Sequence, residues 1–90
     1  MSYQYRALRR FWNSFGDLEQ EQQTSCRRAW RIFRKDPFDP RLKTHRISTL
    51  SARAGRPVYA VWIEPNLRVV FFIKDDIIYT MDVGTHKIYR

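Results

Sequence analysis

The final stretch of the sequence, Leu67–Arg90 (LRVVFFIKDDIIYTMDVGTHKIYR), begins with two predicted strands joined by a tight turn. The segment Leu67–Ile73 is apolar apart from Arg68, which is typical of a strand that is buried on both faces. Lys74–Asp76 interrupts the apolar run with turn residues. From Ile77 to Val83 the side chains alternate with the period of a strand. The chain is therefore expected to be organised around a C-terminal hairpin.

A polar cluster follows this hairpin directly. Gly84 is expected to end the second strand, and the residues after it include Thr85, His86, Lys87, Tyr89 and Arg90. A rigid hairpin that presents imidazole, ammonium, phenol and guanidinium groups together predicts a binding site for an anionic ligand.

Composition limits the class of protein. Ninety residues, 43% of them hydrophobic and 16% aromatic, predict one folded domain over residues 1–90 with a modest core. The net charge of +8 predicts an acidic partner, which could be RNA, DNA, a membrane surface or an acidic protein. A single cysteine, Cys26, excludes an intramolecular disulfide and is typical of a reducing cytoplasm.

The pattern of hydrophobicity argues against a membrane location. We find no apolar run long enough to span a bilayer. The first ten residues, MSYQYRALRR, lack the apolar core of a signal peptide. The sequence therefore predicts a cytoplasmic protein without a membrane partner.

Two helices are expected in the N-terminal third. Tyr5, Leu8, Trp12 and Phe15 share one face of a first helix that Gly16 ends. Asp17 is the expected cap of a second helix, with Gln20 completing a capping box. That helix is expected to end near Lys35, because Asp36 precedes Pro37. A short link between the helices predicts an antiparallel helical hairpin.

The middle of the chain is expected to supply the remaining strands. Leu42–Ile47 and Val58–Ile63 have strand character, Ser48–Pro57 resembles a polar loop, and Glu64–Asn66 is typical of a turn. The predicted fold is α+β, with the helical hairpin packed on one face of a three- to four-stranded antiparallel sheet.

The two histidines suggest a nuclease chemistry. His45 lies beside Lys43 and Arg46, and His86 precedes Lys87. RNA cleavage by a 2′-hydroxyl needs a base for that hydroxyl, an acid for the departing 5′ oxygen and positive charge for the phosphorane-like transition state. Two imidazoles could supply the proton steps, and the cations could bind the phosphate. From spacing alone, the favoured interpretation is that they are unrelated surface histidines.

Three further side chains have open alternatives. Arg68 in an apolar strand is either a phosphate anchor or an edge residue paired with Asp82 or Glu64. Tyr89 either contacts a base or phosphate, or closes the core. Trp62 either stacks on a base or packs in the protein.

Other chemistry is less well supported. Four arginines of the second helix could line RNA or form an ordinary solvated face: Arg27, Arg28, Arg31 and Arg34. Two histidines and one cysteine without a carboxylate cluster do not predict a metal site. The sequence contains no phosphate-binding glycine loop and no serine nucleophile motif, and no cofactor is expected.

The ordered set of motifs resembles the RelE/ParE superfamily of bacterial toxins. It comprises F-W-x-x-F-x-x-L, then R-x-x-x-x-F-x-x-D-P-x-x-P-x-L-x-x-H, then Y-x-V-x-I-x-x-x-L-R-V-V-F, D-D-I-I and V-G-T-H-x-x-Y. It extends from Phe11 to Tyr89 and so covers nearly the whole chain. The resemblance implies two helices against an antiparallel sheet, and a type II toxin that cuts mRNA in the ribosomal A site without a metal. It also implies neutralisation by a cognate antitoxin, and the charge of the chain suggests an acidic one.

The YafQ branch of this superfamily shows the greatest similarity. His45 and His86 match two of its histidines, whereas Trp62 and Asn66 stand where it has a histidine and an aspartate. Arg68 is similar to a phosphate-binding arginine of RelE, and Tyr89 to the C-terminal tyrosine of RelE. The resemblance thus implies catalytic roles for His45, His86, Arg68 and Tyr89.

Six other residues complete the expected site and are assigned to the substrate. They are Lys43, Arg46, Trp62, Asn66, Lys87 and Arg90. The resulting hypothesis is a ribosome-dependent mRNA endoribonuclease that contacts mRNA and ribosomal RNA. Two alternatives remain: a gyrase poison like ParE, or a catalytically weakened protein of this fold that binds nucleic acid or a partner.

Overall fold

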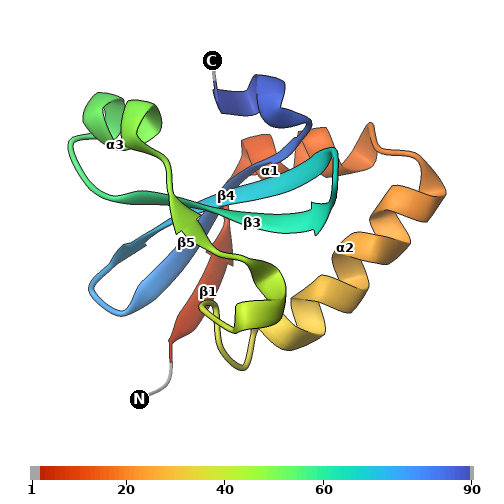
Figure 1. Cartoon of the computed structure of the whole chain (residues 1–90), viewed down its shortest axis with the longest axis horizontal. Coiled ribbons are helices and arrows are strands. Elements are labelled where there is room, and N and C mark those ends of the chain that lie inside the picture. The colour runs from red at the N-terminus through yellow and green to blue at the C-terminus, as the bar shows by residue number, and fades with distance from the viewer. Residues whose placement is uncertain (1–2, 90) are drawn as a thin grey trace.

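A five-stranded sheet in the order β1-β5-β4-β3-β2 forms the centre of the molecule (Figure 1). The computed structural model describes residues 3–89, with the exception of the His86 side chain. The strands are β1 (Gln4–Ala7), β2 (His45–Arg46), β3 (Val58–Glu64), β4 (Leu67–Lys74) and β5 (Ile77–Gly84). The helices are α1 (Arg9–Gly16), α2 (Gln20–Phe33) and α3 (Ser48–Ala54), with short 3₁₀ turns η1 (Pro40–Leu42) and η2 (His86–Tyr89).

The α+β class is confirmed, but the expected sheet of three or four antiparallel strands is wrong. The first residues form β1, which pairs with β5 in parallel, so the sheet is mixed. Tyr5 therefore belongs to a strand, and the first helix begins only at Arg9. Tyr5 is held in this position because its hydroxyl donates to the carbonyls of Phe33 and Arg34, at 3.0 and 2.9 Å.

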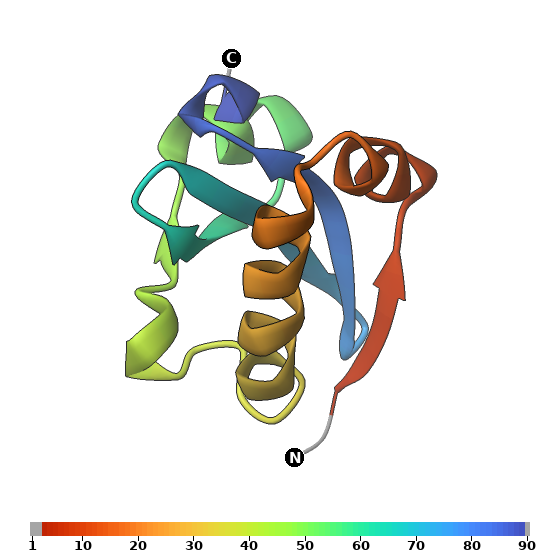
Figure 2. The same ribbon diagram turned by 90° about the vertical axis from the view of Figure 1, so that its right-hand side faces the viewer.

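The two N-terminal helices are present but differ in detail from the prediction. The capping box of α2 is formed by Glu19 and Gln22, not by Asp17 and Gln20. Figure 2 shows α1 nearly end-on and α2 side-on, so the helices cross obliquely instead of lying antiparallel. Helix α1 packs against β5, and α2 packs against β3.

The C-terminal strands follow the prediction closely. Strands β3, β4 and β5 form an antiparallel meander, and β4 is buried over its first five residues. Asp75 and Asp76 both have positive φ, at 53° and 62°, which is the geometry of a hairpin turn that matches the twist of the strands. The turn at Pro65–Asn66 between β3 and β4 is also as expected.

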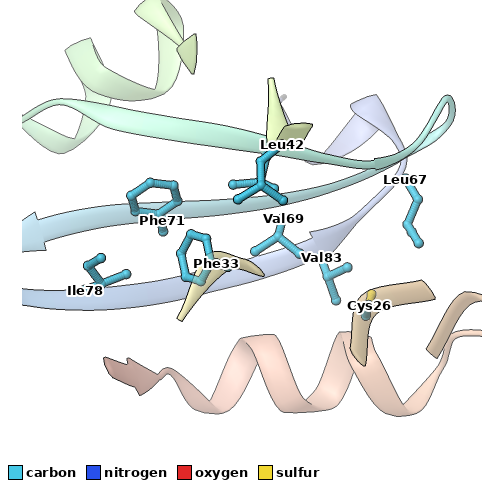
Figure 3. Close-up of a cluster of buried hydrophobic side chains, with 9 residues drawn as sticks. Cys26, Phe33, Leu42, Leu67, Val69, Phe71, Ile78 and Val83 are labelled. Atoms are coloured by element: carbon cyan, nitrogen blue, oxygen red, sulfur yellow. The ribbon is translucent and has the colours of Figure 1, made fainter. Parts of the chain in front are cut away.

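The sheet separates two hydrophobic clusters of unequal size. The larger cluster lies under α1 and α2 and includes Phe33, Val61, Val69 and Phe71 (Figure 3). The smaller cluster, on the other face, has three buried residues: Val58, Ala60 and Val70. Alternation along β3 and β4 creates this division, because successive side chains point to opposite faces.

The segment from Ser48 to Pro57 is not a loop throughout, as the sequence suggested. It contains helix α3, which ends at Gly55 with a left-handed φ of 68°. Ser51 is buried and accepts a hydrogen bond from the Val58 amide at 2.9 Å, which joins α3 to the start of β3. Leu50 of α3 packs on the smaller cluster together with Ile88 and Tyr89 from η2.

Among residues 3–89, no helix combines the length and hydrophobicity required to cross a bilayer.

Candidate functional site

The face of the sheet that carries α3 and η2 also carries Trp62 and Arg68. These two residues are direct cross-strand partners on β3 and β4, and Arg68 is paired on its other side with Gly84 of β5. They share the face of Ala60 and Val70, which lie two residues away along the same strands. The site is therefore built on the rigid centre of the sheet.

Arg68 is buried without a carboxylate partner among the described residues. The residue is 9% exposed, and its Nη1 donates to the carbonyls of Glu64 at 2.7 Å and Leu67 at 3.3 Å. The two carboxylates suggested by the sequence are used elsewhere. The Glu64 side chain accepts from Ser25 Oγ at 2.6 Å, and the Asp82 side chain pairs with Arg10 Nε at 2.9 Å. The edge ion pair considered from the sequence is thus absent from the described structure.

The guanidinium of Arg68 lies on the indole of Trp62. The Arg68 Cζ atom is 3.9 Å from the centre of that ring, and Lys43 Nζ lies 4.9 Å from the same centre. Cation–π attraction holds both cations near the tryptophan, which is itself 36% exposed. Trp62 thus links a buried cation to one at the surface.

Tyr89 lies near Arg68, on the side of the smaller hydrophobic cluster. Its hydroxyl is buried and has no hydrogen-bond partner within the described structure. Burial raises the pKa of this phenol, while the positive charge of Arg68 nearby acts in the opposite direction. The ring packs on the smaller hydrophobic cluster, and the Tyr89 carbonyl accepts from Arg53 of α3 at 3.2 Å. Tyr89 therefore closes the core and also approaches Arg68.

His45 lies at the outer strand β2 and is exposed. Its Nδ1 is 3.0 Å from the Lys43 carbonyl. A carbonyl can only accept, so this contact places a proton on Nδ1 and leaves Nε2 with a free lone pair in the neutral ring. Lys43 has a left-handed φ of 49°. In this conformation its carbonyl accepts from His45 Nδ1, and its ammonium lies near the ring of Trp62.

The remaining expected residues are less closely associated with this group. Asn66 is exposed in the β3–β4 turn, and Arg46 directs its Nε toward Ser51 Oγ of α3 at 3.4 Å. Lys87 is exposed in η2. His86 begins η2, but its side chain is not among the described groups, and Arg90 lies outside the described residues.

Two contributors to the site were not identified from the sequence. Arg53 was part of a predicted loop, yet α3 positions it to bind the Tyr89 carbonyl. Gly84 permits the close return of η2, because a Cβ at this position would lie 2.7 Å from Ile88 Cγ2. A glycine directly before a polar cluster was the available signal, and it was interpreted only as the end of a strand.

Comparison with known proteins identifies the fold. No family model matches the sequence, and no curated protein gives a significant match. The crystal structure of YafQ from E. coli strain BL21(DE3) aligns over 97% of each chain, with a TM-score of 0.75 and 10% identity. The archaeal RelE–RelB complex from Pyrococcus horikoshii OT3 aligns over 94% of this chain and 96% of that chain, with a TM-score of 0.72 and 12% identity. The E. coli DinJ–YafQ toxin–antitoxin complex aligns over 98% and 97%, with a TM-score of 0.76 and 9% identity. The chain therefore has the fold of the RelE and YafQ toxins, as its sequence motifs suggested.

Proposed function

We propose that this protein is the toxin of a type II toxin–antitoxin pair and acts as a ribosome-dependent mRNA endoribonuclease. The observation that carries the proposal is Arg68, a guanidinium that is nine-tenths buried and has no carboxylate partner in the described structure. A buried charge is costly unless it is compensated, and a phosphate oxygen would compensate it. The exposed imidazole of His45 is linked to Arg68 through two intermediate residues. His45 contacts the carbonyl of Lys43, and the side chains of Lys43 and Arg68 both lie near the Trp62 ring.

The proposed reaction is a transesterification without a cofactor. Nε2 of His45 takes the proton of the 2′-hydroxyl as the O2′–P bond forms. Arg68 and Lys43 stabilise the negative charge that develops on the phosphoryl oxygens. The P–O5′ bond then breaks, and His86 of η2 is the proposed donor of the proton that O5′ receives. Tyr89 is proposed to assist by supporting Arg68 from the interior.

Programmed ribosomes provide the direct test. Wild-type protein is expected to cut the message within the A-site codon, which mapping of the mRNA ends would show. His45→Ala is expected to slow cleavage by about 100-fold or more, because general base catalysis contributes factors of that size. Arg68→Met keeps most of the stem but removes the charge, and His86→Ala tests the proposed acid. Lys35→Ala, an exposed cation that follows α2, serves as the matched control.

Intact mRNA with the wild-type protein would reject the proposal, and so would cleavage that is undiminished in His45→Ala. Circular dichroism of each variant separates a chemical loss from unfolding. A catalytically weakened, nucleic-acid-binding protein is the second candidate, because the Trp62 ring covers one face of the Arg68 guanidinium. That candidate predicts salt-dependent ribosome binding without cleavage. A supercoiling assay tests the gyrase-poison alternative.

An acidic antitoxin is the proposed regulatory partner. The fold neighbours include structures described as RelE–RelB and DinJ–YafQ complexes. The net charge of +8 on this chain favours a partner of opposite charge, and a disordered acidic segment could fold upon binding.

A further inference from the structure

A second basic surface lies at the end of α3, on the same face of the sheet as the candidate nuclease site. Arg56 lines two adjoining pockets there, with volumes of about 480 and 470 Å³. Strands β4 and β5 contribute aromatic side chains to the first pocket, and β2 contributes an arginine to the second. Because Arg56 belongs to both pockets, they form one continuous surface. We call it the α3 surface, and its cationic and aromatic members are Arg46, Arg56, Phe72, Lys74 and Tyr79.

Two stacked aromatic rings form part of the α3 surface. Phe72 and Tyr79 are cross-strand partners on β4 and β5, and their ring centres lie 4.8 Å apart with an angle of 17° between the planes. Both side chains are partly exposed. The Arg56 Cζ atom lies 4.9 Å from the centre of the Phe72 ring, which is a distance typical of a cation–π contact. Flat aromatic faces beside a guanidinium can accept a stacked nucleobase.

The end of α3 fixes the position of Arg56. Gly55 has a left-handed φ of 68°, and the amides of Gly55 and Arg56 both donate to the Ser51 carbonyl, at 3.0 and 3.3 Å. This glycine turn ends the helix and leads the chain into β3, where Val58 pairs with Phe72. Arg56 therefore lies close to the partner strand of Phe72, and the hydrogen-bonded turn holds its backbone in place before any ligand binds.

The cations of the α3 surface are not neutralised by carboxylates of the described chain. Within residues 3–89, the ion pairs are formed by two other arginines, Arg10 and Arg41. Asp75 and Asp76 follow Lys74 in the β4–β5 turn and reduce the positive potential on that side. An anionic ligand is therefore expected on the α3 side of Lys74, over the aromatic pair.

Single-stranded RNA is the ligand that this combination favours. Nucleobases can stack on the exposed aromatic faces while the cations on either side bind phosphates. An acidic peptide would pair with the cations, but its carboxylates would leave the aromatic faces unused. A free mononucleotide would occupy only part of a surface that extends through two pockets.

We infer that the α3 surface is a second binding site for the RNA strand that the candidate nuclease site would cut. Bases of this strand stack on Phe72 and Tyr79, and its phosphates pair with the three cations. Arg68 and Phe72 lie on the same face of β4, about 13 Å apart along the strand at about 3.3 Å per residue. One RNA strand could therefore contact both sites. The inference rests on the proposed function for the identity of the ligand, and it adds binding residues away from the scissile phosphate.

A 2′-O-methyl oligouridine provides a probe that cannot be cut, because the hydroxyl that would attack phosphorus is blocked. We expect saturable binding of a dodecamer with a Kd below about 100 μM, and amide NMR shifts at residues of α3, β4 and β5. A dinucleotide is too short to contact both sites, and it is expected to bind at least about tenfold more weakly. Oligoglutamate tests an acidic peptide as the occupant and is expected to leave these amides unshifted.

Matched variants separate stacking from charge. Tyr79→Leu removes the ring and is expected to weaken binding of the dodecamer by about tenfold, whereas Tyr79→Phe keeps the ring and should bind nearly as wild type. Arg56→Ala is expected to weaken binding and to make the slope of log K against log salt shallower by about 0.7, the value for one phosphate contact on a single strand. Lys35→Ala makes the same charge change on an exposed residue outside the α3 surface, and it should leave the affinity nearly unchanged.

Several results would overturn the inference. They are absence of saturable binding, equal losses in Arg56→Ala and Lys35→Ala, equal binding by the two Tyr79 variants, a dinucleotide that binds as tightly as the dodecamer, and shifts of these amides by oligoglutamate. Arg68→Met is expected to weaken binding of the dodecamer as well, because one strand contacts both sites. An unchanged affinity in that variant would assign the α3 surface to a different RNA and would also reject the inference.

The binding experiment and the cleavage experiment can fail separately. Binding of the uncleavable strand at the α3 surface without cleavage of message on programmed ribosomes would support the binding site and reject the nuclease. Cleavage of message without shifts at α3, β4 and β5 would support the nuclease and reject the α3 surface as a binding site.

Discussion

The two faces of the sheet differ in what their side chains do. The face under α1 and α2 contains most of the buried apolar residues, with Phe71 wholly buried against Phe33 and Tyr59. The face under α3 and η2 has a smaller core beside Trp62 and the buried cation Arg68. The larger core can hold the strands in place while the other face tolerates an arginine without a carboxylate partner among the described residues. The comparison indicates that stability and candidate chemistry are divided between the faces.

Neighbouring phenylalanines on β4 test this division most strongly. Phe71→Ala is expected to lower the free energy of unfolding by about 3–5 kcal/mol, because it leaves a cavity in the larger core. Phe72→Ala, on the other face, should cost about 1 kcal/mol, since that ring is partly exposed and stacks on Tyr79. Urea unfolding measures both changes. Equal losses would show that the two faces contribute similarly to stability.

A methyl group at Gly84 should disturb the functional face selectively. The added Cβ would lie 2.7 Å from Ile88 Cγ2, so Gly84→Ala is expected to displace η2 and cost about 1–3 kcal/mol through overpacking. The double variant Gly84→Ala/Ile88→Ala removes the clashing methyl group. It should be more stable than the sum of the single changes predicts, which a double-mutant cycle would measure. Strict additivity would mean that this close approach does not position η2.

The smallest expected effect concerns Cys26, in the larger core. Burial raises the pKa of this thiol to about 11. The folded protein therefore keeps the proton as pH rises from 9.0 toward 11, while the unfolded chain loses it, so the free energy of unfolding should fall across this range. At pH 8, alkylation by iodoacetamide should be about 100-fold slower than in the urea-unfolded chain, a factor that corresponds to two pKa units. Equal rates would show that the cysteine is accessible and the core open.

The sequence predicted the parts of the fold that local patterns encode. Strands β3 to β5 have clear alternation or continuous apolar runs, with turns marked by Pro65 and Asp75. Strand β1 was missed because Tyr5 and Leu8 also fit a helical stripe and because its partner β5 lies at the other end of the chain. Helix α3 was missed because its segment is polar and has no side-chain cap. Long-range pairing and tertiary context decided both cases.

The candidate site was predictable as residue types but not as an arrangement. Arg68 was identified from a charge in an apolar strand, whereas its stacking on Trp62 depends on the cross-strand register of β3 and β4. The role of the Lys43 carbonyl requires a left-handed residue, which a lysine adopts only when its surroundings impose it. Contacts of this kind arise only when the segments are assembled.

The parallel pairing of β1 with β5 has a consequence for synthesis. Tyr5 is aligned with Ile78, so β1 has no strand partner until the chain has been translated through β5. Since folding during translation generally proceeds from the N-terminus, β1 must wait for β5 before it can pair, and η2 is made after both strands. If the protein cuts mRNA on ribosomes, its candidate site cannot be complete before η2 has been made, because η2 contributes Tyr89 to the site of Arg68.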